Sequence, residues 1–178
     1  MAPSLASRVI TVAMLSMSWA VNIASASDAE TRVALMVNFA RYAEWPAGKS
    51  PDDRGEWNLC SDPSDPDIAA ALKSIDGEAL YEQNIHIRIL RPDEDITDCH
   101  LLYLSSLNDE AKVRQRIEAA HGQPTLTVSD YEDFARMGGM IELVIDDGRY
   151  KFDVDYSRVL QSHLRLSSSM LKLARRVR

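Results

Sequence analysis

The chain has few of the residues on which catalytic and metal sites depend. Its 178 residues include two cysteines, four histidines and seven glycines. A structural zinc site needs about four Cys or His ligands, often in closely spaced pairs, whereas the histidines here are scattered. They are His86, His100, His121 and His163. The sequence also lacks a glycine-rich phosphate loop and a Gly-x-Ser-x-Gly elbow. We therefore expect no catalytic residue, no metal site and no cofactor, and we expect a protein that is not an enzyme.

Positive charge is also scarce, with 20 basic residues against 27 acidic ones and a formal net charge of −7. Nucleic-acid binding depends on neutralising phosphates, so this composition argues against a nucleic-acid partner. The exception is the segment "KLARRVR" at residues 172–178. We interpret it as the basic end of a helix that complements the helix dipole. Contact with an anionic membrane surface is the alternative.

The N-terminus lacks an apolar run long enough for a stable membrane span. The apolar stretch at residues 9–23 is interrupted by polar residues, whereas a spanning helix needs about 20 nearly continuous apolar residues. Arg8 precedes the stretch, and Ala24-Ser25-Ala26 follows it with the spacing of a cleavage site. We predict a secretory signal peptide at residues 1–26, cleaved near Ala26, and a single mature domain at residues 27–178.

Strand and helix patterns alternate along the predicted mature chain. Ser27 to Glu30 and Ser129 to Glu132 have the form of capping boxes and predict helix starts, as does Asp65 before Pro66. Apolar segments between the helices predict strands. These segments lie at residues 56–60, 84–90, 100–104 and 124–128.

The strongest local signal is a hairpin, "MIELVI" and "RYKFDVD", around the turn Asp147-Gly148. One face should carry Ile141, Leu143 and Ile145 opposite Tyr150, Phe152 and Val154. Asp153 and Asp155 then face the other way, and we interpret them as solvated acids. With the alternating strands and helices, this predicts a three-layer α/β/α fold. Its sheet should be mostly parallel, with an antiparallel hairpin at one edge.

Cys60 and Cys99 are the only cysteines. In an oxidising compartment two cysteines in a small domain most often form a disulfide. A redox-active thiol pair is the first alternative, and a metal site or a nucleophile is the second. Residues adjacent on a strand point to opposite faces, so His100 is badly placed to activate Cys99. A Cys-x-x-Cys motif, which a thiol oxidoreductase would need, is absent.

An apolar stripe in the last quarter of the chain is a candidate partner-binding surface. It consists of Tyr156, Val159, Leu160 and Leu164. Ordinary packing into the core is the alternative interpretation.

Seven short segments, in order, carry a resemblance to a known family. They are "NFARYAEWP", "LC", "CHLLYLS", "TLTVSD", "FARMGGMIEL", "RYKFDVD" and "LRLSSSMLKLAR", and they span residues 38–175. In this order the chain resembles the YfiR family of periplasmic proteins. The resemblance implies a repressor of an inner-membrane GGDEF diguanylate cyclase of the YfiN type, which lowers cyclic di-GMP and biofilm formation.

The resemblance also implies partners and a redox link. An outer-membrane lipoprotein of the YfiB type would sequester the repressor, which would be a homodimer. Cys60 and Cys99 match one cysteine pair of the family. A second pair, which flanks the Gly-Gly segment in some relatives, is absent between Phe134 and Ile145. A redox switch at that place cannot operate in this protein.

A periplasmic small-molecule-binding sensor module is the alternative function. An open α/β sheet binds ligands at the carboxyl ends of its strands. Such a crevice would be lined by Ser61, Ser105, Ser129 and Asp130.

Overall fold

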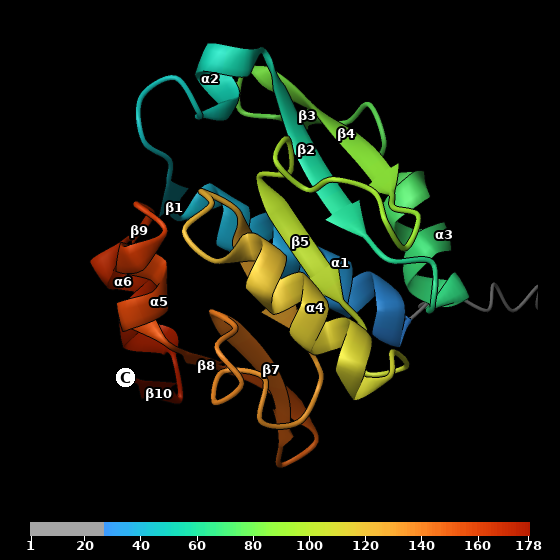
Figure 1. Cartoon of the computed structure of the whole chain (residues 1–178), viewed down its shortest axis with the longest axis vertical. Helices are drawn as coiled ribbons and strands as arrows, with labels where there is room; N and C mark the ends of the chain where they lie inside the picture. The colour runs from blue at the N-terminus through green and yellow to red at the C-terminus, as the bar shows by residue number, and fades with distance from the viewer. Residues whose placement is uncertain (1–26) are drawn as a thin grey trace, which may run out of the picture.

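The computed structural model describes residues 27–178, in which strands and helices alternate (Figure 1). The strands are β1 Ala43–Glu44, β2 Glu56–Ser61, β3 Ala79–Leu80, β4 Gln83–Ile89, β5 Leu101–Leu104, β6 Leu126–Ser129, β7 Ile141–Asp146, β8 Arg149–Val154, β9 Arg165–Leu166 and β10 Arg176–Val177. The helices are α1 Asp28–Arg41, α2 Pro51–Arg54, α3 Pro66–Ser74, α4 Glu110–Ala120, α5 Tyr156–Gln161 and α6 Ser168–Leu173. The predicted signal peptide lies outside the described residues.

The main sheet is mostly parallel, as predicted. Its strand order is β10-β8-β7-β6-β5-β2-β4-β3, and β1 pairs with β9 in a separate ribbon. The central strands β4, β2, β5, β6 and β7 are parallel to one another. The hairpin β7–β8 and the short strand β3 add the antiparallel pairs. The hairpin is not the outermost element, because β10 pairs with β8 in parallel beyond it.

Helices cover both faces of this sheet, which confirms the three-layer α/β/α fold. In β5, Leu101 and Tyr103 belong to the core cluster that contains residues of α1 and α3. Leu102 and Leu104 belong to the second cluster, which contains residues of α4. Figure 1 shows α4 in front of β5 and α1 behind it. The side-chain alternation of a strand therefore separates the two layers.

Two helices start at the predicted caps. Ser27 and Glu30 form the capping box of α1, and Asp65 accepts a hydrogen bond from the amide of Ile68 at the start of α3. Ser167 caps α6 in the same way. Helix α1 ends at Arg41, because the residues that follow pair with β9. Among residues 27–178, no helix combines the length and the apolar composition needed to cross a membrane.

The helix predicted at Ser129 is wrong. Ser129 is the last residue of β6, and its hydroxyl donates to the carbonyl of Leu104 on β5 at 2.6 Å. The following residues form turns, in which the buried carboxylate of Glu142 accepts from the amides of Asp133 and Ala135. Sheet and side-chain hydrogen bonds thus satisfy the groups that a helix would otherwise pair.

The two glycines after these turns have different structural reasons. Gly138 has a φ of +106°, a backbone angle that residues with a side chain rarely adopt. Gly139 has no positive φ, but a Cβ atom there would lie 2.1 Å from the ring of Phe134. Gly139 therefore lets the chain pass directly over a buried aromatic ring before β7 begins.

The hairpin has the predicted register, with Ile141 opposite Val154 and Leu143 opposite Phe152. The interpretation of its acids as solvated is wrong. Asp153 is buried and receives two hydrogen bonds from the guanidinium of Arg175, at 2.8 and 2.7 Å. These bonds lower the pKa of Asp153. Asp155 caps α5.

Only Lys172 and Leu173 of the basic C-terminal segment lie at the end of a helix, and the arginines that follow do not. Helix α6 ends at Leu173, and the chain continues into strand β10 beside β8. The buried carboxylate of Asp153 needs a cation, and Arg175 supplies it. This ion pair holds the C-terminal segment beside β8.

Candidate functional site

Cys60 and Cys99 form a disulfide, as predicted, across 39 residues of sequence. Cys60 lies in β2, and Cys99 lies just before β5, which pairs with β2. Both cysteines are buried in the cluster between the sheet and α4. The bridge thus joins two strands that are neighbours in space, as a structural crosslink does.

His100 faces away from the disulfide, as strand alternation predicts. Its ring packs beside Trp45 and Trp57, with ring centroids 5.9 and 5.8 Å away. The Nδ1 atom accepts a hydrogen bond from the amide of Asn58 at 3.0 Å. Burial, assisted by the charge of Arg54, lowers the pKa of His100 to about 4. The residue is therefore a neutral core histidine and not a base for Cys99.

Acidification is expected to destabilise the protein through His100. A histidine in an unfolded chain has a pKa of about 6.5, so between that pH and about 4 the unfolded state binds the proton and the folded state does not. Neutral His100 makes its full contribution to the free energy of unfolding above pH 6.5, and this contribution is lost as the pH falls toward 4. The expected loss is about 3 kcal/mol. Urea unfolding measured across this pH range checks it.

The control is His100→Gln, because a glutamine side chain at this position does not titrate. Carboxylates also gain protons there, so the test compares the pH slopes of the two proteins. The variant should show the shallower slope. Equal slopes would contradict a buried neutral His100.

The residues predicted to line a ligand crevice do meet at the carboxyl edge of the sheet. Ser61 is the last residue of β2, and Ser105 follows β5. Ser129 is the last residue of β6, and Asp130 follows it. Each of these side chains already has a protein partner. The Ser105 hydroxyl donates to Asp65 at 3.1 Å, and Asp130 accepts from the backbone amide of Ser106 at 2.7 Å.

The guanidinium of Arg32, from α1, fills this edge. Its Nη1 atom lies 2.9 Å from the carboxylate of Asp130, 3.3 Å from that of Asp65 and 3.0 Å from the hydroxyl of Tyr103. Its Nη2 atom lies 2.9 Å from Asp28, which also accepts from the hydroxyl of Tyr150. One arginine thus connects α1 with β5, with the residue after β6 and with the start of α3.

The electrostatics favour a permanently charged arginine. Burial alone lowers the pKa of Arg32, but Tyr103 and Asp130 outweigh it and the net shift is upward. Burial raises the pKa of the Tyr103 hydroxyl, and Asp130 adds to this shift. The tyrosine therefore stays protonated, accepting from Arg32 and donating to Asp130 at 2.8 Å.

A second arginine forms hydrogen bonds at the same edge, from the helix layer on the opposite face of the sheet. Arg116, on α4, bonds to the carboxylate of Asp62 at 3.0 Å and to the carbonyls of Arg91 and Glu94, both at 2.8 Å. Neither arginine was singled out from the sequence. The available signal was a basic residue within the buried face of each helix, where Arg32 lies beside Val33 and Arg116 shares a face with Val113.

The predicted partner-binding stripe is divided by the fold. Val159 and Leu164 are buried in the core, and Tyr156 is half-buried against it. Leu160 is 50% exposed on α5, and Leu173 on α6 is 72% exposed. Only the exposed part of the stripe can contact a partner without opening the core. Figure 1 shows α5, β9 and α6 together at one end of the molecule.

Comparison with known proteins agrees with this architecture. A crystal structure titled as a conserved domain protein from Vibrio cholerae O1 biovar El Tor str. N16961 matches with a TM-score of 0.54 at 10% sequence identity. The match covers 85% of this chain but only 60% of that one, and it shows the fold alone. Residues 29–175 match the family described as YfiR/HmsC-like. The match includes all elements from α1 to α6. The chain therefore belongs to the YfiR/HmsC-like family, whose members are periplasmic regulators of cyclic di-GMP signalling.

Proposed function

We propose that this protein is a periplasmic repressor. It binds the periplasmic domain of an inner-membrane GGDEF diguanylate cyclase of the YfiN type and lowers cyclic di-GMP and biofilm formation. The observation that carries the proposal is the family match over residues 29–175. The proposal includes export by a signal peptide at residues 1–26, a homodimer, and release of the cyclase by a YfiB-type outer-membrane lipoprotein.

The surface that we assign to the cyclase consists of the exposed leucines Leu160 and Leu173 on α5 and α6. Buried residues anchor both helices, with Val159 under α5 and Met170 under α6. Exposed leucines on short, firmly held helices offer apolar contact area at little cost in side-chain entropy. A repressor must bind one signalling state of the cyclase better than the other, and a firmly held apolar surface fits one shape of its partner better than another.

Deleting the gene is expected to raise cellular cyclic di-GMP, and restoring the wild-type gene is expected to lower it. Leu160→Arg should fail to lower it, because a charge in an apolar contact carries a desolvation cost. The thermal midpoint of this variant should stay near that of the wild type, since the side chain is half exposed. Cyclic di-GMP in cell extracts and thermal unfolding of the purified variant are the measurements.

The matched control is Leu107→Arg, an exposed leucine in the loop before α4, 65% accessible. This variant should repress as the wild type does. Repression by Leu160→Arg at the wild-type level would place the contact elsewhere on the protein. A cyclic di-GMP level that does not respond to deletion would refute the repressor itself.

A further inference from the structure

A hollow of about 870 Å³ lies at the amino ends of β2 and β4, at the opposite end of these strands from Arg32. Its walls come from the end of α1, from β1 and Trp45, from the start of α2, and from the β3–β4 turn. The volume is within the range of small-molecule sites, about 300–1,000 Å³. No role has been assigned so far to this part of the protein.

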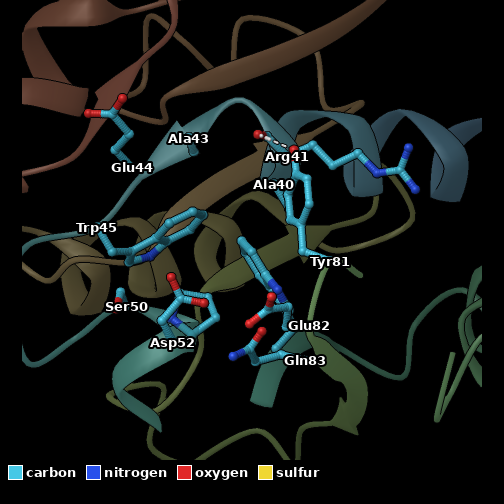
Figure 2. Close-up of a pocket in the computed structure, with 12 residues that line it drawn as sticks. Ala40, Arg41, Ala43, Glu44, Trp45, Ser50, Asp52, Tyr81, Glu82 and Gln83 are labelled. Atoms are coloured by element: carbon cyan, nitrogen blue, oxygen red, sulfur yellow. Dashed lines mark hydrogen bonds between the residues drawn. The ribbon is translucent and has the colours of Figure 1, made fainter. Parts of the chain in front are cut away.

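Three aromatic rings from distant chain segments line the hollow: Trp45, Trp57 and Tyr81. The indoles of Trp45 and Trp57 are nearly perpendicular, at 87°, with centroids 5.1 Å apart. They therefore form two adjacent walls and do not stack. Figure 2 shows Trp45 and Tyr81 on two sides of the hollow, with the Tyr81 hydroxyl directed to the carbonyl of Arg41, 3.2 Å away.

Tyr81 holds its place at a conformational cost. It has a φ of +59° at the first position of a two-residue turn, where glycine is usual. It is also 68% exposed, so burial of its ring does not compensate for the strain. A strained, exposed aromatic residue beside a hollow is a recognised sign of a functional position.

The charge of the lining is mainly negative. Glu44, Asp52 and Glu82 contribute carboxylates, and Arg41 is the one cation among the lining residues. In Figure 2, Asp52 lies below Trp45 and Glu82 lies below Tyr81, whereas the guanidinium of Arg41 extends away. Aromatic faces with nearby carboxylates stabilise a desolvated organic cation, through the ring quadrupoles and through opposite charge.

Two lining side chains each carry a polar atom without a hydrogen bond. The Nε1 atom of Trp45 and the Oε1 atom of Gln83 are buried, and neither has a hydrogen-bond partner among residues 27–178. Rotation of either side chain therefore breaks no hydrogen bond, whereas a new partner would satisfy a group that is costly to leave unpaired. The hollow therefore offers a ligand one unpaired donor and one unpaired acceptor.

From these observations we propose that the hollow is a binding site for a small quaternary or alkyl-ammonium ion. Trp45, Trp57 and Tyr81 supply the aromatic walls, and Asp52 and Glu82 supply the neutralising charge. The inference is independent of the repressor function, because it concerns binding by the purified protein.

Calorimetric titration of the mature protein, residues 27–178, with choline tests the proposal. Its neutral isostere 3,3-dimethylbutan-1-ol has the same shape without the charge. Choline should bind saturably, and the isostere should bind at least about tenfold more weakly. Tyr81→Gly, which removes the ring and relieves the turn, should weaken choline binding about fivefold. Asp52→Asn/Glu82→Gln should weaken it to a similar degree at low salt.

A fluorescence titration locates the binding. Two of the three tryptophans line the hollow, and the third, Trp19, lies in the proposed signal peptide, so indole emission of the mature protein comes from Trp45 and Trp57 alone. Choline should change this emission with the affinity found by calorimetry. The matched control is Tyr42→Ala, an exposed tyrosine near the hollow but not in its lining, which should bind as the wild type does. Absence of saturable choline binding, or equal binding of the isostere, would overturn the proposal.

Discussion

Removal of the Cys60–Cys99 disulfide is expected to lower the free energy of unfolding by about 4 kcal/mol. The bridge spans 39 residues, and closing a loop of this length removes that much conformational entropy from the unfolded chain. The loop contains α3, β3 and β4. Without the bridge, the unfolded chain regains conformational freedom over this whole segment. Urea unfolding of Cys60→Ala/Cys99→Ala against the oxidised wild type measures the difference.

The control for this prediction is the reduced wild-type protein, which opens the same loop without removing sulfur atoms from the core. Both proteins should lose similar stability, with a small additional loss in the double variant from the cavities left by the two side chains. A loss below about 1 kcal/mol in both would show that the unfolded chain is not constrained by the bridge.

Arg32→Met is expected to cost about 3–5 kcal/mol of stability. The change leaves Asp65 and Asp130 without their cation in a site where Arg32 is only 9% exposed. An uncompensated buried charge is among the most destabilising consequences of a single substitution. Chemical unfolding monitored by circular dichroism measures the loss.

Two further variants separate the charge from the loss of packing. Arg41→Met, at an exposed position on the same helix, should change stability by no more than about 0.5 kcal/mol. Arg32→Met combined with Asp65→Asn and Asp130→Asn should recover part of the loss, because the carboxylates that needed the cation are gone. If Arg32→Met costs no more than Arg41→Met, the ion cluster at the carboxyl edge does not contribute to stability.

The sequence predicted the parts of the fold that depend on neighbouring residues. The hairpin turn Asp147-Gly148, the cap Asp65 and the alternation in β4 are local patterns, and each is present in the structure. The family resemblance and the pairing of Cys60 with Cys99 were also predicted, since a chain with two cysteines allows one intramolecular bridge.

The sequence did not predict features that depend on distant contacts. Arg32 and Asp130 are separated by 98 residues, and a single ion pair produces no periodicity along the chain. Strands β9 and β10 have two residues each, too few to show alternation. The hollow beside Trp45 was missed for the same reason, because its aromatic walls meet only after β2 and β4 have paired.

The position of β2 imposes an order on folding when the chain emerges with its N-terminus first. Strand β2 pairs with both β4 and β5, and β4 comes first in the sequence. One side of β2 is therefore completed early, while its other side remains an open edge that can pair with other chains. During this interval Cys60 is a solitary thiol, because its partner appears 39 residues later. Oxidation that is too early would couple Cys60 to a foreign thiol, so correct maturation depends on the timing of the oxidant as well as on its presence.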